Sequence, residues 1–73
     1  MEHEKYIGKI VADKDSNKLG KIVEIKEIQD NKTKIWKPYL LIQVKNFLRK
    51  DVIIVIELSK VIKYDDFYVW IDI

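Results

Sequence analysis

Apolar residues recur along this chain in short segments, and clusters of polar residues separate the segments from one another. Short runs rich in Val, Ile, Tyr and Phe, bounded by Asp, Asn and Ser, are typical of all-β sandwiches and barrels. No segment carries a long apolar stripe at the 3.6-residue spacing of a helix. The pattern predicts six strands, at about residues 7–12, 19–28, 39–45, 52–57, 60–64 and 67–73.

Within these segments, alternation of apolar and polar residues predicts which side of each strand faces the core. In the second segment, Val23 and Ile25 are expected to face inward and Glu24 to face the solvent. Residues 29–37 are expected to form a loop, and Pro38 suits the start of a strand because it lacks an amide donor. One face of the third strand is expected to hold Leu40, Ile42 and Val44.

The four letters GKIV occur twice, at 8–11 and at 20–23, and the polar run DKDSN lies between the copies at 13–17. Asp and Asn form turns through local hydrogen bonds from their side chains to the backbone. The two copies are therefore predicted to be the arms of an N-terminal β-hairpin. A glycine inside such an arm indicates a bulge or a close approach of two backbones.

The same run suggests a calcium-binding hairpin as an alternative. Asp13, Asp15 and Asn17 occupy the first, third and fifth positions of a calcium loop, and Glu24 occupies the twelfth. The position that requires glycine for the sharp turn holds Lys18 instead, which adds a positive charge. Glu24 is moreover expected on a strand, where it would point away from the loop, so the turn interpretation is favoured.

The size and composition of the chain favour a single small β-barrel, closed or nearly closed, with antiparallel strands, over residues 1–73. A domain of this size buries only about 60% of the surface of its unfolded chain, and the absence of cysteine excludes disulfides as a supplement. The run VIIVI at 52–56 would template aggregation if it lay on an open edge, and closure would remove that edge. Residues 1–5 are polar and are expected to form a flexible tail.

The residues offer little for catalysis or for a cofactor. The chain has no cysteine, and its one histidine, His3, lies in the expected tail. The usual pairs of a nucleophile and a base therefore cannot be assembled. We expect a protein that is not an enzyme and that has no cofactor, bound metal or small-molecule substrate.

The start MEHEKY differs from a signal peptide, because it is polar and carries acidic residues. The most apolar run, 52–56, is far shorter than the ~20 residues that span a bilayer. A soluble, cytoplasmic protein without membrane insertion is expected.

The net charge is only +2, and thirteen of the fourteen basic residues are lysines interspersed with acidic residues. Base-reading proteins favour arginine and concentrate their charge on one face, so the balance disfavours a nucleic-acid partner. The segment 31–39 nevertheless interleaves cations and aromatic rings, as surfaces that stack on RNA bases do. The candidate RNA contacts are Lys32, Lys34, Trp36, Lys37 and Tyr39. The competing interpretation is a solvated loop whose Trp36 folds back over one end of the barrel.

The last strand predicts a protein-binding surface. If its inward face holds Phe67, Val69 and Ile71, then Tyr68, Trp70 and Asp72 face outward. Tyr and Trp are enriched in protein interfaces. The interface candidates are Tyr68 and Trp70, with Tyr64 from the preceding strand. The alternative is the reversed orientation, in which Trp70 belongs to the core.

The opening IGKIVADKDSNKLGKIVEI resembles the PRC-barrel signature, which has G-K-x-V, a polar hairpin turn and then G-K-[IV]-x-[DE]-I. A hydrophobic strand at 39–44 and the closing run VIIVIELSKVIKYDDFYVWI extend the resemblance over nearly the whole chain. The chain departs from the family where many members carry Gly directly after the Asp of the turn, and in its segment 31–37.

The resemblance implies a small six-stranded β-barrel that has no catalytic residues and serves as a docking module. Relatives in this family include the cytoplasmic domain of the photosynthetic reaction centre H subunit and the C-terminal domain of the ribosome maturation factor. The chain most resembles stand-alone archaeal members. Some of these are implicated in cell division as dimers that link components of the division machinery. The leading prediction is thus a homodimeric adaptor that binds another protein. An RNA- or ribosome-associated module is the alternative.

Overall fold

The computed structural model describes residues 2–46 and 49–73, and these residues contain six strands and two short 3-10 helices but no α-helix. The predicted number of strands is therefore confirmed. The elements are η1 (Glu2–Tyr6), β1 (Ile10–Asp13), β2 (Lys18–Gln29), β3 (Trp36–Asn46), β4 (Arg49–Glu57), η2 (Leu58–Lys60), β5 (Val61–Tyr64) and β6 (Tyr68–Ile71). The stretch expected to be a flexible tail thus contributes to η1.

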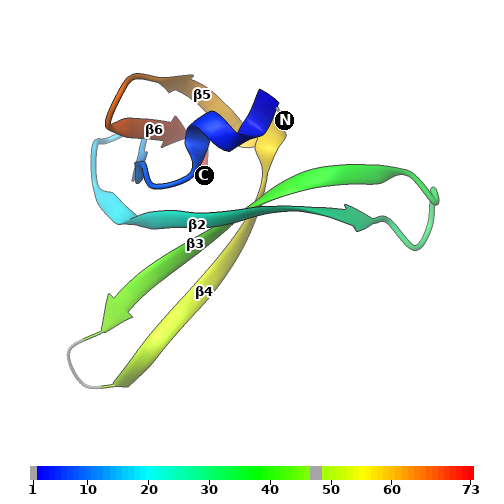
Figure 1. The fold of residues 1–73 in the computed structure, drawn as a ribbon, viewed down its shortest axis with the longest axis horizontal. Helices are drawn as coiled ribbons and strands as arrows, with labels where there is room; N and C mark the ends of the chain where they lie inside the picture. The colour runs from blue at the N-terminus through cyan, green and yellow to red at the C-terminus, as the bar shows by residue number, and fades with distance from the viewer. Residues whose placement is uncertain (1, 47–48) are drawn as a thin grey trace.

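The strands form one sheet in the order β4-β3-β2-β1-β6-β5. The pairs β1–β2, β2–β3, β3–β4 and β5–β6 are antiparallel, and β4 and β5 form the two edges. Strands β1 and β6 lie parallel, so the sheet is mixed and the expectation of an antiparallel sheet is wrong at this pair. Parallel neighbours require a long crossover connection. Here the whole excursion from β2 to β5 provides it and returns the chain beside its first strand (Figure 1).

Two arms project from the compact part of the molecule (Figure 1). The first arm consists of the C-terminal part of β2 and the N-terminal part of β3. The second arm consists of the C-terminal part of β3 and the strand β4. The radius of gyration is 12.5 Å, whereas a compact chain of this length is expected near ~11 Å. The central part of β3 pairs with both β2 and β4 and joins the two arms to the core.

The core lies where β1, β2, β3 and β6 meet. Its fully buried side chains are Val11, Ile22, Leu40, Ile42, Val69 and Ile71. Leu40 and Ile42 confirm the inward face predicted for the third strand, and Val44 on the same face packs against the cluster while partly buried. Val69 and Ile71 confirm the inward face of the last strand. Burial of each such side chain contributes about 1.5–3 kcal/mol relative to exposure.

A β-bulge in β2 overturns one of the predicted orientations. Ile22 pairs with Ile42 and Glu24 pairs with Leu41, so Val23 is an extra residue without a partner in the ladder. Val23 is 41% exposed and Ile22 is fully buried, opposite to the predicted inward position of Val23. The extra residue shifts the alternation by one, because successive side chains point to opposite faces. Glu24 is exposed, as predicted.

The predicted N-terminal hairpin is confirmed, with Ile10 opposite Lys21 and Val11 opposite Gly20. Asp13 organises the turn. Its Oδ1 accepts hydrogen bonds from the backbone N–H groups of Asp15 and Asn17, both at 2.9 Å. Its Oδ2 accepts from Asn17 Nδ2 at 3.1 Å. The turn is thus held by local side-chain bonds, as its composition predicts.

Gly20 marks a close approach between β2 and β3, as expected for a glycine inside a strand. A Cβ atom on this residue would collide with the carbonyl oxygen of Gln43 and would lie 2.9 Å from Cγ2 of Ile42. A side chain here would push apart two central strands of the sheet.

The third strand begins at Trp36, earlier than predicted, so part of the expected loop at 29–37 belongs to the sheet. Pro38 lies within β3 opposite Glu27. It precedes the part of β3 that pairs with β4, which starts at Tyr39. Pro38 therefore has a partner strand on one side only, where its missing N–H is tolerated. Residues 46–51 were expected to connect the third and fourth strands, but β4 already starts at Arg49. Residues 47 and 48 lie outside the described residues.

Candidate functional site

Tyr68 and Trp70 lie side by side on the outer side of β6. Their ring centroids are 5.7 Å apart and their planes are tilted by 32°. Both side chains are half-buried. The alternate residues of the strand, Val69 and Ile71, point into the core. The predicted outward orientation of the pair is thus confirmed, and the alternative with Trp70 in the core is wrong. Asp72, also predicted to face outward, is exposed and lies 3.7 Å from Lys14.

Phe67 does not share the inward face predicted for it. It precedes β6, and its side chain is 72% exposed. The hairpin turn explains this, because Asp65 Oδ1 accepts hydrogen bonds from the N–H groups of Phe67 at 2.8 Å and Tyr68 at 2.7 Å. These two hydrogen bonds hold the pKa of the Asp65 carboxyl below its ordinary value. The turn fixes where β6 starts and leaves Phe67 outside the strand.

Two lysines stack on the aromatic pair. Lys63 Nζ lies 4.6 Å from the centroid of the Trp70 ring, and Lys18 Nζ lies 5.8 Å from that of Tyr68. Lys63 is directly opposite Trp70 in the β5–β6 ladder, which places both side chains on one face. We call these four residues, Lys18, Lys63, Tyr68 and Trp70, the aromatic face. Sequence reasoning missed both lysines, although counting outward from the turn at Asp65 would have paired Lys63 with Trp70.

The aromatic face continues onto β1. Ile10 and Ala12 pair with Tyr68 and Trp70 in the parallel β1–β6 ladder, and Ala12 is buried. The two rings are therefore backed by a neighbouring strand on one side and are accessible on the other. The arrangement presents flat aromatic surface to a partner. Binding would cost little side-chain entropy, because partly packed rings already have few accessible rotamers.

Tyr64 lies away from the other two interface candidates. It pairs with Val69, so its side chain is on the opposite face of the sheet from Trp70. Its ring packs edge-on against the buried ring of Tyr6, with centroids 5.1 Å apart. Lys5 Nζ donates a 2.8 Å hydrogen bond to the Tyr64 hydroxyl, and this bond lowers the pKa of that hydroxyl. Tyr64 thus helps to fasten η1 to β5.

The residues predicted to contact RNA lie on the first arm. Trp36 is 60% exposed at the start of β3, so the competing interpretation, a Trp folded back over the barrel, is wrong. Lys32 and Lys34 are exposed in the loop before it. Lys37 lies 3.6 Å from Glu57 in an ion pair, and Tyr39 is three residues from Trp36, hence on the opposite face of the strand. The first three candidates are therefore exposed on this arm, whereas Lys37 and Tyr39 are partly buried.

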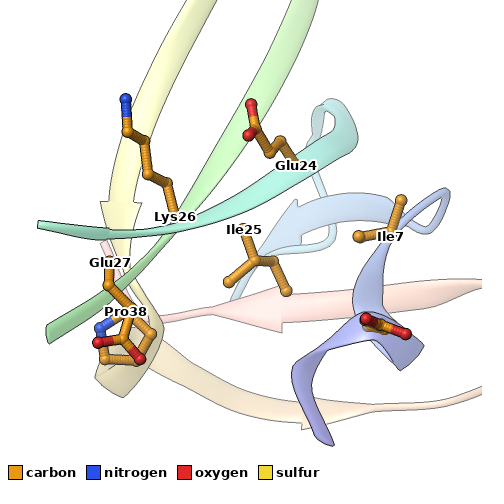
Figure 2. A pocket seen from close by; sticks show the side chains of 7 residues that line it. Ile7, Glu24, Ile25, Lys26, Glu27 and Pro38 are labelled. Atoms are coloured by element: carbon orange, nitrogen blue, oxygen red, sulfur yellow. The ribbon is translucent and has the colours of Figure 1, made fainter. Parts of the chain in front are cut away.

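A shallow groove of about 310 Å³ runs between η1 and the first arm. It is lined by Glu4, Ile7, Glu24, Ile25, Lys26, Glu27 and Pro38. In Figure 2, Ile25 points into the space bordered by Ile7, while Glu24 and Lys26 lie on the other side of β2. The groove combines an apolar floor with acidic side chains from separate elements, and we assign it no chemistry.

The structure brings the predicted calcium ligands Asp13, Asp15 and Asn17 into one turn, where the Asp13 carboxylate serves the turn itself. Both carboxylate oxygens of Asp13 accept hydrogen bonds within the turn, and those bonds lower the pKa of this carboxyl. Among residues 2–46 and 49–73, no cluster of three or more His, Cys, Asp or Glu side chains is suited to hold a metal ion. Glu24 lies on β2, beyond the bulge. Calcium binding stays a prediction, and no cluster of metal-binding side chains among the described residues supports it.

Comparison with protein-family models found no matching family, and comparison with curated proteins found no matching sequence. Within the described part of the chain, no helix has the length and apolar character needed to cross a membrane.

Proposed function

We propose that this chain is a non-catalytic docking module, and that it binds another protein through the aromatic face. The observation that carries the proposal is the stacking of Lys63 on Trp70 beside Tyr68. Half-buried Tyr and Trp rings provide rigid apolar contact area of the kind that dominates the energy of protein interfaces. The flanking ammonium groups favour a partner that presents carboxylates around an apolar side chain.

The proposal includes the finer fold assignment, a PRC-like barrel that stays open between β4 and β5. Its support is the paired GKIV hairpin and the order of the six strands, with β1 and β6 side by side. A role as a scaffold of archaeal cell division rests on the resemblance of the sequence to stand-alone PRC-barrel proteins. It is the most specific biological role that we propose.

The experiment compares two tryptophan variants as bait. Immobilised wild-type protein, Trp70→Ala and Trp36→Ala are exposed to a lysate of the source organism, and captured proteins are quantified by mass spectrometry. A protein enriched on wild type should be lost on Trp70→Ala and retained on Trp36→Ala, because only Trp70 lies on the aromatic face. Equal capture by all three baits, each confirmed as folded by circular dichroism, would overturn the proposed surface.

A second candidate function, RNA binding, is favoured by the exposure of Trp36, Lys32 and Lys34 on the first arm. Stacking of a base on Trp36 is worth about 1–3 kcal/mol, and contacts of the lysines with phosphates make the affinity fall with salt. The test is titration of a fluorescent single-stranded RNA at several salt concentrations. Trp36→Ala should weaken binding while Trp70→Ala preserves it, and no binding at low salt would exclude this function.

A further inference from the structure

The two edges of the sheet are protected very differently. At one edge, β5 is four residues long, carries Lys63, and is fastened to η1 by the contact of Tyr64 with Tyr6. At the other edge, β4 is nine residues long. Its run 52–56 contains no charge and no proline. Natural proteins usually protect an exposed edge with charges, proline, a bulge or a covering segment, because unpaired backbone groups recruit other strands.

Both faces of the β4 run are apolar and exposed. Val52 and Ile54 pair with Val44 and Ile42 and so lie on the core side, yet the side chains at 52–55 are between 37% and 51% exposed. Ile53 and Val55 lie on the other face, opposite Gln43 and Leu41. Continuous apolar sequence on both faces is the pattern of a strand that is covered on both faces, not of a strand exposed to solvent on both.

The surface area of the single chain points to the occupant of this edge. The accessible surface is 5695 Å² for a chain of 8.8 kDa, whereas a folded monomer of that mass is expected to expose roughly 4,800 Å². The excess of roughly 900 Å² is close to the ~800 Å² that each partner buries in a standard interface. An interface of standard size with a second copy of the chain would cover an area of this order.

We propose that two copies associate through β4, as antiparallel edge strands related by a two-fold axis. Directly opposed residues in such a pair must both turn their N–H and C=O groups toward the partner strand or both turn them away. Their numbers therefore differ by an even number. The register centred on Ile54 opposes Ile53 to Val55 and Val52 to Ile56, so all five residues of the run face apolar residues. The two sheets then join into one, and the edge no longer exists.

The inference deepens the proposed docking function, because a dimer presents two aromatic faces to its partners. In that respect it rests on the proposed function. It places the self-association of the predicted homodimer on β4 and not on the interface candidates Tyr68 and Trp70. The aromatic faces are then left free to bind a different protein.

The test is the mass of the folded protein in solution, measured by light scattering at micromolar concentration. Wild type should be a dimer, and Ile53→Lys combined with Val55→Lys should give a folded monomer. Both side chains are exposed in the single chain, and lysines on opposing strands repel one another. Ile62→Lys, the same kind of change on the β5 edge, should remain dimeric. A monomeric wild type, a dimeric double variant or a monomeric Ile62→Lys would overturn the assignment.

Hydrogen exchange provides a readout that does not depend on any variant. Alternate amides of 52–56 bond to β3, and the others point outward. In the proposed dimer both sets are protected, and dilution to monomer should release only the outward set. Free exchange of every second amide at high concentration would contradict the pairing. Trp70→Ala should lose the partner protein but stay dimeric, so a failure of the docking function and a failure of the β4 interface give different results.

Discussion

Lys63 and Trp70 face each other across the β5–β6 hairpin, and the ammonium nitrogen of Lys63 lies 4.6 Å from the centre of the Trp70 ring. The pair joins a cation to an aromatic surface on the side of β6 that points away from the core. Its geometry follows from the hairpin, because the turn that begins at Asp65 sets which residues are opposite one another. The relationship therefore connects the local turn sequence to the surface that we propose for docking.

The Lys63→Met variant separates the two contributions of that lysine. The cation–π contact at an exposed site is worth about 0.5–1 kcal/mol, so the free energy of unfolding should fall by no more than that amount. Capture of an acidic partner should fall more strongly, because a positive charge beside the docking rings is lost. Urea unfolding and quantified capture measure the two effects. Lys26→Met, on the first arm, serves as the control and should preserve capture.

Gly20→Ala should destabilise the fold. The added Cβ would meet the backbone of Gln43, and a backbone neighbour cannot be moved by a change of rotamer. Overpacking of this kind costs about 1–3 kcal/mol in the free energy of unfolding. Chemical denaturation with detection by circular dichroism provides the value. Lys21→Ala, an exposed neighbour on the same strand, should be nearly neutral, and an equally neutral Gly20→Ala would contradict the close approach of β2 and β3.

Acid should weaken the two turns that are built on aspartates. The folded-state pKa values of Asp13 and Asp65 are both lowered from 3.8, mainly by hydrogen bonds from backbone N–H groups. A lowered folded-state pKa gives stability that is fully present above the ordinary value. That stability is lost as the pH falls below 3.8 and through the folded-state value.

The measurement is the midpoint of urea unfolding as a function of pH. Asp65→Asn keeps an acceptor oxygen for Phe67 and Tyr68 but removes the titrating charge. The variant should be less stable than wild type at neutral pH, and it should lose less stability in acid. An acid slope unchanged from that of wild type would show that Asp65 does not contribute in this way.

The parts of the fold that local sequence determines were predicted from it. The GKIV hairpin, the turn at 13–17 and the alternation around Val69 and Ile71 each depend on neighbouring residues. Tyr68 and Trp70 followed from the same alternation. These features need no knowledge of distant parts of the chain.

The features that were missed depend on contacts between distant segments. Val23 was predicted to face inward, but a bulge in the pairing of β2 with β3 leaves it without a partner residue. The parallel pairing of β1 with β6 depends on the path of the whole chain. Tyr64 was grouped with Trp70 because both are aromatic and close in sequence, yet the register of their hairpin places them on opposite faces.

Site-specific crosslinking from Tyr68 tests the central claim, docking through the aromatic face, most directly. A photoreactive phenylalanine analogue is introduced at position 68, or at position 64 as the control on the opposite face, and each folded protein is irradiated in a lysate of the source organism. Docking through the aromatic face should give a covalent adduct with a partner protein from position 68, which the control at position 64 does not form. A partner that crosslinks from position 64 and not from position 68 would contradict the proposed docking surface.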